Sequence, residues 1–252
     1  MKIPLVLFST LLAFTAPWGF GQASSKTTIF YEKNAQIELI SPQGIRVFID
    51  VWDPQGISAP VTDTDILLTT HGHPDHLNAS FAREFKGQQL LVRSGKIQQG
   101  DVTIESIPSA HNEGDPFVAK SGSNYLFIIS VGDLRVIHMG DIGQNALTPE
   151  QLAALGKPDI LVTQFENGYS AMNASNRKGF RLAEQLSPRL ILPTHNSLDA
   201  AEIAMSKWRC LATDKSSIQV NSASLGAETQ ILFMGNTSAS YADKTKALPC
   251  LW

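Results

Sequence analysis

The sequence predicts an α/β fold in which two mixed β-sheets pack face to face with helices on their outer sides, an αββα four-layer sandwich. Short runs rich in β-branched and aromatic residues, bounded by turn residues, occur in both halves of the chain and predict strands in both. Segments with apolar residues at helical spacing lie between these runs. No linker, charge run, low-complexity stretch or fixed-period repeat follows Ser25. We therefore expect one compact domain.

The first half of the chain consists mainly of predicted strands. Ser-Pro-Gln-Gly at 41–44 forms a turn in an N-terminal meander, and Gly-Asp at 132–133 forms the turn of a later hairpin. Apolar residues at helical spacing predict a single helix at 75–85. The predicted strands are 27–31, 35–40, 45–51, 65–69, 89–92, 102–107, 125–131 and 134–139.

The second half alternates between helices and strands. Helices are predicted at 148–155, 173–186 and 198–211. The predicted strands are 159–163, 189–192, 217–220 and 230–234. This alternation favours helices on the outer face of a sheet.

The composition is that of an ordinary globular chain. Hydrophobic residues make up 43% of the 252 residues, which is enough apolar material for a substantial core. Twenty basic and 23 acidic side chains give a formal charge of -3. This balance argues against binding of nucleic acid through bulk positive charge, so a small-molecule substrate is the expected partner.

The first 23 residues are predicted to be a cleaved export signal. Lys2 precedes an uncharged stretch whose apolar part is 3–16. We expect cleavage after Ala23, which leaves a single mature domain at 24–252 with 19 basic and 23 acidic residues, a net charge of -4. The mature protein would be periplasmic or secreted, without stable membrane insertion. An uncleaved anchor is the alternative, but Pro17 interrupts the roughly 20 apolar residues that a membrane span needs.

Export would place the two cysteines, Cys210 and Cys250, in an oxidising compartment where they can form a disulfide. The bond would join the C-terminus to the predicted helix 198–211. Two separate buried cysteines are an equal alternative, because the sequence does not give the distance between their Cα atoms.

One short segment concentrates side chains that bind metals. A buried strand is followed by His71-Gly-His73-Pro-Asp75-His76, which holds three imidazoles and a carboxylate within six residues. His71 and His73 are spaced to point in the same direction, and Asp75 and His76 fall at the start of the next predicted helix. Crowded imidazoles are costly to bury and repel one another when protonated, so a bound cation explains the pattern better than packing does.

Three further candidates each follow a predicted strand: His111, Asp141 and His195. Each is weak alone, because a single histidine, or an aspartate after glycine, is usually a surface or turn residue. Together they would make five of the six histidines metal ligands. The sixth, His138, fits a half-buried core position or a residue that supports a ligand.

The ordered set of seven residues resembles the ligand set of the metallo-β-lactamase superfamily. The set is His71, His73, Asp75, His76, His111, Asp141 and His195. The resemblance covers about 27–233 and implies the αββα sandwich, with the site at one edge between the sheets. The stretch Asn-Gly-Tyr-Ser-Ala-Met-Asn at 167–173, followed by a helix, resembles the ascorbate-6-phosphate lactonase-like branch.

Carried over residue by residue, the resemblance implies two divalent metal ions, with His71, His73 and His111 on the first, Asp75, His76 and His195 on the second, and Asp141 between them. Zinc is the expected metal for imidazole and carboxylate ligands. Manganese and iron are the alternatives, because no thiolate takes part.

The implied activity is hydrolysis in which a metal-bridging hydroxide attacks a carbonyl or phosphoryl centre. Asp75 is the expected catalytic residue, because it would orient the hydroxide and handle protons. A lactone, ester or phosphodiester of a small molecule is the expected substrate. β-Lactam hydrolysis is disfavoured, because the zinc β-lactamases lack a bridging aspartate at the position of Asp141. The competing hypothesis is a non-catalytic exported scaffold that binds metal with the same fold.

Two loops, 112–122 and 164–175, are expected to determine substrate preference. The residues in them that we expect to line a pocket are Glu113, Phe117, Phe165, Glu166 and Tyr169. Simple loop packing is the alternative for each of them.

Overall fold

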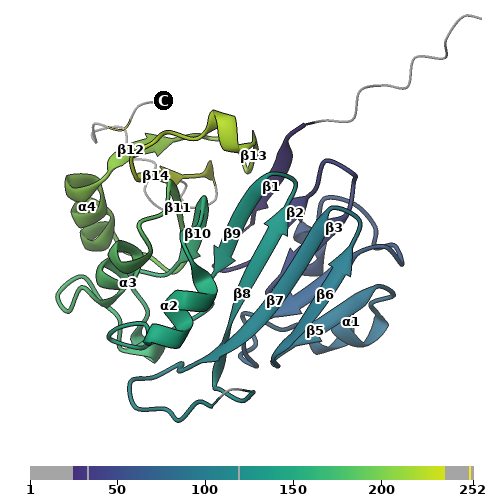
Figure 1. Cartoon of the computed structure of the whole chain (residues 1–252), viewed down its shortest axis with the longest axis horizontal. Coiled ribbons are helices and arrows are strands. Elements are labelled where there is room, and N and C mark those ends of the chain that lie inside the picture. Colours follow the sequence, from purple (N-terminus) through teal and green to yellow (C-terminus); the bar gives the residue numbers. More distant parts are fainter. Residues whose placement is uncertain (1–24, 33, 119, 236–249, 251–252) are drawn as a thin grey trace, which may run out of the picture.

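The computed structural model describes residues 25–32, 34–118, 120–235 and 250. Two β-sheets pack face to face in this part of the chain, and helices cover the outer faces (Figure 1). This confirms the predicted αββα sandwich of mixed sheets. The predicted signal peptide at 1–23 lies outside the described residues. None of the described helices combines the length and the apolar character needed to cross a membrane.

The first sheet has six strands in the order β13-β1-β2-β3-β4-β5. Strands β13 to β3 pair antiparallel, whereas β3, β4 and β5 run parallel, so the sheet is mixed. The bounds are β1 Thr27–Tyr31, β2 Ile37–Ile40, β3 Arg46–Ile49, β4 Ile66–Thr69, β5 Gln88–Leu91 and β13 Ser217–Val220.

The second sheet has eight strands in the order β12-β14-β11-β10-β9-β8-β7-β6. Its β6 to β9 half is antiparallel and its β9 to β12 half is parallel. The bounds are β6 Gly95–Gln99, β7 Val102–Ser109, β8 Asn124–Val131, β9 Leu134–His138, β10 Ile160–Thr163, β11 Leu190–Pro193, β12 Arg209–Ala212 and β14 Gln230–Phe233.

Four α-helices form the outer layers. They are α1 Ala79–Glu84, α2 Pro149–Leu155, α3 Lys178–Leu186 and α4 Leu198–Lys207. Three 3-10 turns accompany them: η1 Pro54–Gly56, η2 Gly168–Ser170 and η3 Ser222–Ser224. Helix α1 packs on the six-stranded sheet through Ala82, and the other three helices cover the eight-stranded sheet.

Apolar side chains that alternate along the strands form the core. In β8, Phe127 and Ile129 lie between the two sheets, whereas Leu126 and Ile128 face the layer of α2, α3 and α4. Successive side chains of a strand point to opposite faces, so a strand buried on both sides needs an unbroken apolar run. The two sheets are thereby held at a fixed spacing, which fixes the relative positions of the loops at their edges.

Helical periodicity overestimated three helices. The predicted helix 173–186 begins only at Lys178. The predicted helix 75–85 begins only at Ala79, because Asn78 has extended backbone angles and its side chain accepts a hydrogen bond from the Phe81 amide. Asp75 and His76 therefore lie in the turn before α1. The predicted helix 198–211 ends at Lys207, and the chain continues directly into β12, which pairs with β14. Strand β6 was not predicted.

A disulfide joins Cys210 of β12 to Cys250, with the Cα atoms 4.7 Å apart. The two cysteines are 40 positions apart in the sequence, so the bond closes a long loop. Both residues are buried against the apolar layer beneath α3 and α4. Of the two alternatives that the sequence leaves open, the structure has the disulfide.

Reducing this disulfide should lower the free energy of unfolding by about 4 kcal/mol, because the bond restricts the unfolded chain over a long loop. Urea denaturation with and without a thiol reductant measures the change. The double variant Cys210→Ala with Cys250→Ala should be less stable than the oxidised protein and should not respond to the reductant. A reductant effect of equal size in the double variant would show that the disulfide is not its cause.

Candidate metal centre

The predicted ligands come from loops that follow four strands. The segment with His71 follows β4, His111 follows β7, Asp141 follows β9 and His195 follows β11. Strands β7, β9 and β11 run in the same direction in one sheet, so their carboxyl ends meet at one edge. Functional sites of α/β sheets form at this edge, because the loops there converge.

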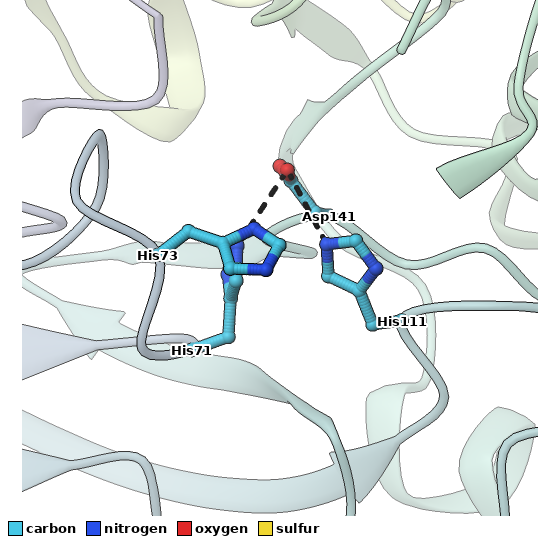
Figure 2. Close-up of side chains that lie close together, drawn as sticks. All are labelled: His71, His73, His111 and Asp141. Carbon is cyan, nitrogen blue, oxygen red and sulfur yellow. Dashed lines mark ion pairs between the residues drawn. The ribbon is translucent and has the colours of Figure 1, made fainter. Parts of the chain in front are cut away.

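The structure brings all seven side chains together in two adjacent groups. The first consists of His71, His73, His111 and Asp141, and Figure 2 shows the three imidazoles converging on the carboxylate. The second consists of Asp75, His76 and His195. Within each group, the candidate ligand atoms lie within 4.8 Å of one another. This spacing is close enough for the atoms of each group to share one ion.

Asp141 lies between the two groups. Its Oδ2 is 3.7 Å from Nε2 of His71 and 3.8 Å from Nε2 of His111 (Figure 2). Its Oδ1 is 3.4 Å from Nε2 of both His76 and His195. Each oxygen thus faces a different group, and the carboxylate is buried. The geometry is that of a bridging ligand.

Several polar atoms of the site lack partners within the described chain. Nε2 of His71, Nε2 of His111 and Oδ1 of Asp141 are buried without a hydrogen bond. Nε2 of His195 lies 3.3 Å from Nε2 of His76. Buried polar atoms are normally satisfied, and those that are not require an explanation. Lone pairs that converge from imidazoles and a carboxylate fit a divalent cation, and the set of ligands suits zinc, manganese or iron.

A buried carboxylate that the sequence analysis missed, Asp50, supports both groups. Its Oδ2 lies 2.8 Å from Nδ1 of His76 and accepts a 2.7 Å hydrogen bond from the hydroxyl of Thr70. The Thr70 hydroxyl lies 3.1 Å from Nδ1 of His71. Because the hydroxyl donates to Asp50, it accepts from His71. Both histidines are therefore held with Nδ1 protonated and Nε2 free to bind a metal, the usual role of such a supporting carboxylate.

These contacts determine how the histidines titrate in the metal-free protein. Burial, with a smaller contribution from the nearby His76, lowers the pKa of His71 to about 3. Burial acts in the same direction on His76, but Asp50 and Asp141 outweigh it and raise the pKa of His76 to about 10. Burial would raise the pKa of Asp141, yet His76 and other imidazoles lower it overall. The metal-free site thus contains a protonated His76 between two carboxylates.

The metal-free protein should be most stable near pH 6.5. The pKa of His71 is below its ordinary 6.5, so below pH 6.5 the unfolded chain binds more protons than the folded chain. At pH 5 this difference lowers the free energy of unfolding by about 2 kcal/mol. The raised pKa of His76 acts in the opposite direction. Its contribution to the free energy of unfolding is complete below pH 6.5 and disappears as the pH rises towards 10. Urea denaturation of chelator-treated protein at pH 5, 6.5 and 9 measures this profile. Equal stability at all three values would contradict these protonation states.

Replacing Thr70 by valine should weaken metal binding about tenfold, because His71 loses its acceptor and Asp50 loses a donor. Titration with zinc in competition with a chelator measures the affinity. Thr69→Val is a matched control, because the Thr69 hydroxyl is also buried but has no hydrogen-bond partner among the residues that the structure describes. If both variants bind zinc equally well, the Thr70 hydroxyl does not support the site.

Of the two alternatives predicted for His138, a half-buried core position and a residue that supports a ligand, the structure has the second: His138 is fully buried and holds the turn that carries Asp141. Its Nδ1 accepts from the Gly140 amide at 3.1 Å, and its Nε2 lies 3.2 Å from the Ala35 carbonyl oxygen. Gly140 has a φ of +53°, and a Cβ there would approach Oδ1 of Asn124 to 2.5 Å. That oxygen accepts from the Asp141 amide, so only glycine fits at this position.

An open pocket of about 470 Å³ adjoins the first group of ligands. Its lining residues are His71, Gly72, His73, His111, Asn112, Asp115, Ser123 and Tyr169. Of the predicted substrate contacts, Tyr169 lines this pocket: its side chain is 80% exposed, and its ring centroid is 6.1 Å from that of His73.

The other predicted substrate contacts do not line this pocket. Glu113 accepts a hydrogen bond from the Asn145 amide, and Glu166 accepts from the Ala174 amide and the Ser197 hydroxyl. Phe117 lines a separate groove beside α2. The prediction that Phe165 lines a substrate pocket is wrong. Its side chain is fully buried beneath α3, with its ring centroid 4.7 Å from that of Phe180. A large apolar residue directly after a strand is more easily accommodated in the core than at a polar site.

Comparison with known proteins assigns the family. The model of the β-lactamase superfamily domain matches residues 30–195, so the chain belongs to the metallo-β-lactamase superfamily. A metal-dependent hydrolase of the UPF0173 group from Carboxydothermus hydrogenoformans is 23% identical over 223 residues, which cover 78% of this chain and 93% of the relative. A UPF0173 relative from Methanoregula boonei is 24% identical over 169 residues, covering 60% of this chain and 74% of that protein.

A solved structure shares the fold. It is a protein of Thermotoga maritima assigned to the metallo-β-lactamase superfamily as a zinc-dependent hydrolase. Its TM-score is 0.61 at 19% identity, and the match covers 82% of this chain and 98% of that protein. At this level of identity, the likeness establishes the fold alone.

Proposed function

We propose that this protein is an exported, dinuclear metal-dependent hydrolase that cleaves a lactone, ester or phosphodiester bond in a small molecule. The observation that carries the proposal is the Asp141 carboxylate, whose two oxygens face two separate groups of histidines. The names of the curated relatives, which are metal-dependent hydrolases, support the activity class.

His71, His73 and His111 would hold the first ion, and Asp75, His76 and His195 the second, with Asp141 shared. Ions bound by these residues would supply Lewis-acid chemistry: they would make a bound water more acidic and polarise the oxygen of the bond to be cleaved. Asp50 and Thr70 keep His76 and His71 in the tautomers that present Nε2. Asn167 donates a 2.7 Å hydrogen bond to Oδ2 of Asp141 and so fixes the orientation of the shared carboxylate.

Asp75 differs from the other ligands in its exposure. Its side chain is 45% exposed, whereas that of Asp141 is 3% exposed. Oδ2 of Asp75 is 3.8 Å from Nε2 of His76. A carboxylate that is both at the site and open to solvent can accept a proton from the attacking water and release it, which is the role we assign to Asp75.

The proposed export is supported by two features. One is the apolar N-terminal stretch with its predicted cleavage after Ala23. The other is the disulfide between Cys210 and Cys250, because disulfides persist in oxidising compartments. Expression of the full chain in a bacterial host, followed by intact-mass measurement of the exported protein, tests this proposal. A mass that corresponds to 24–252 with one disulfide supports it, and retention of the full chain in the cytoplasm contradicts it.

The decisive experiment combines metal analysis with a substrate panel. The purified protein should contain close to two divalent ions per chain and should hydrolyse at least one lactone, ester or phosphodiester. Treatment with a chelator should abolish the activity, and addition of zinc, manganese or iron should restore it. A protein that carries both ions but hydrolyses none of these classes would support the alternative, an exported scaffold that binds metal without catalysis.

A further inference from the structure

The pocket beside the metal centre has an unusual charge distribution. Apart from the three histidines, one of its lining residues carries a formal charge at neutral pH, and that residue is Asp115. No lysine or arginine is among the lining residues of the described chain. The other side chains that line the pocket are neutral, and they belong to Asn112, Ser123 and Tyr169.

Asp115 is held in a fixed position. Its Oδ2 accepts hydrogen bonds from the Asn112 amide at 2.9 Å and from the Ser123 hydroxyl at 2.7 Å. The Ser123 hydroxyl in turn accepts from the His111 amide at 2.8 Å, so the carboxylate is linked to a metal ligand. The bonds from Ser123 and Asn112 lower the pKa of Asp115, which is ionised at neutral pH.

Lys120, a basic residue of the same loop, does not line the pocket and does not offset this charge. Glu113, which is itself acidic, is engaged with the Asn145 amide. Tyr169 stands exposed beside His73 on the pocket wall. A fixed carboxylate and an exposed aromatic ring both attract cations. The proposed metal ions would supply positive charge at the ligand end of the pocket; away from them, sites that recognise phosphate or carboxylate groups use arginine, lysine or backbone amides.

We infer that the substrate presents a cationic or uncharged group, and not a phosphate or carboxylate, to this pocket, and that Asp115 sets this preference. The inference rests on the proposed function and narrows it to lactones or esters that carry no negative charge on the part facing Asp115. Asp115 acts here as a specificity-determining residue and takes no part in bond cleavage.

Binding of three matched thiols to the Co²⁺-loaded protein tests the inference without the natural substrate. Thiolates bind metal ions directly, and their absorption band with Co²⁺ reports occupancy. The probes are 2-aminoethanethiol, which is cationic, 2-mercaptoethanol, which is neutral, and 3-mercaptopropionate, which is anionic. Because these thiols differ in acidity, each dissociation constant is compared between the native protein and Asp115→Asn.

Asparagine keeps one oxygen for the bonds from Asn112 and Ser123 and removes the charge. We expect Asp115→Asn to raise the dissociation constant of 2-aminoethanethiol and to lower that of 3-mercaptopropionate, each about threefold. A change of this size corresponds to two unit charges about 7 Å apart in a water-like dielectric. The neutral thiol should bind equally well to both proteins. The changes should diminish at high ionic strength, which a merely structural effect would not do. Glu228→Gln, which removes an exposed charge before β14, is the matched control and should change none of the three.

If Asp115→Asn changes the dissociation constants of all three thiols equally or in the same direction, the inference is overturned and the proposed function is left intact. If Asp115→Asn does not fold, Asp115→Ser is used, and the same pattern of signs is expected. A native protein that binds no Co²⁺ would overturn the proposed function and this inference together.

Discussion

For the dinuclear site that we propose, Asp141→Asn should reduce the bound metal from two ions per chain to one or fewer and slow hydrolysis by about a thousandfold. An asparagine has one oxygen, and its amide nitrogen does not ligate metals. The oxygen would keep the hydrogen bond from Asn167, and the nitrogen would face the Nε2 atoms of His76 and His195 in a side chain of the same shape, so the substitution should retain the fold. Metal analysis and the rate on the best substrate of the panel measure both effects.

The control for Asp141→Asn is Asp159→Asn. Asp159 lies before β10, at the opposite end of the parallel strands, where its carboxylate accepts hydrogen bonds from the Arg135 amide and from Arg189. Asp159→Asn should lower the free energy of unfolding and leave the metal content unchanged. The comparison therefore separates damage to the fold from loss of a bridging ligand. Two tightly bound ions in purified Asp141→Asn would show that the carboxylate does not bridge.

The sequence predicted the fold because the fold depends on local patterns. The unbroken apolar run of β4 predicts a buried strand, and the alternation of strands and helices predicts the layers. The seven ligand candidates are recognisable because each follows a strand. Their convergence could only be inferred from the resemblance to a family, since it depends on the order and direction of strands far apart in the chain.

Residues that support the site were harder to predict. Asp50 lies inside the predicted strand 45–51, whereas β3 ends at Ile49 and leaves Asp50 at the edge of the sheet. Its partners Thr70 and His76 are 20 and 26 positions away, so no local pattern links the three residues. Asp115 was missed because its importance depends on which side of a loop faces the pocket. Phe165 shows the opposite error: its loop position suggested a substrate contact, whereas the space beneath α3 buries it.

Asp75→Asn should separate catalysis from metal binding. Asparagine can still offer a neutral oxygen to the second ion, and His76, His195 and Asp141 remain as ligands. We therefore expect the metal content to fall by less than one ion per chain at saturating metal. The rate should fall by a factor of about 10² to 10⁴, because the amide does not accept the proton that the carboxylate takes. Single-turnover rates measured at full metal occupancy distinguish the two effects.

The matched control for Asp75→Asn is Asp63→Asn, which removes an exposed carboxylate before β4, at the end of that strand away from the site. It should change neither metal content nor rate. If Asp75→Asn retained the native rate at full metal occupancy, proton transfer would have to be assigned to another group. If it lost the second ion entirely, Asp75 would act chiefly as a ligand, as Asp141 does.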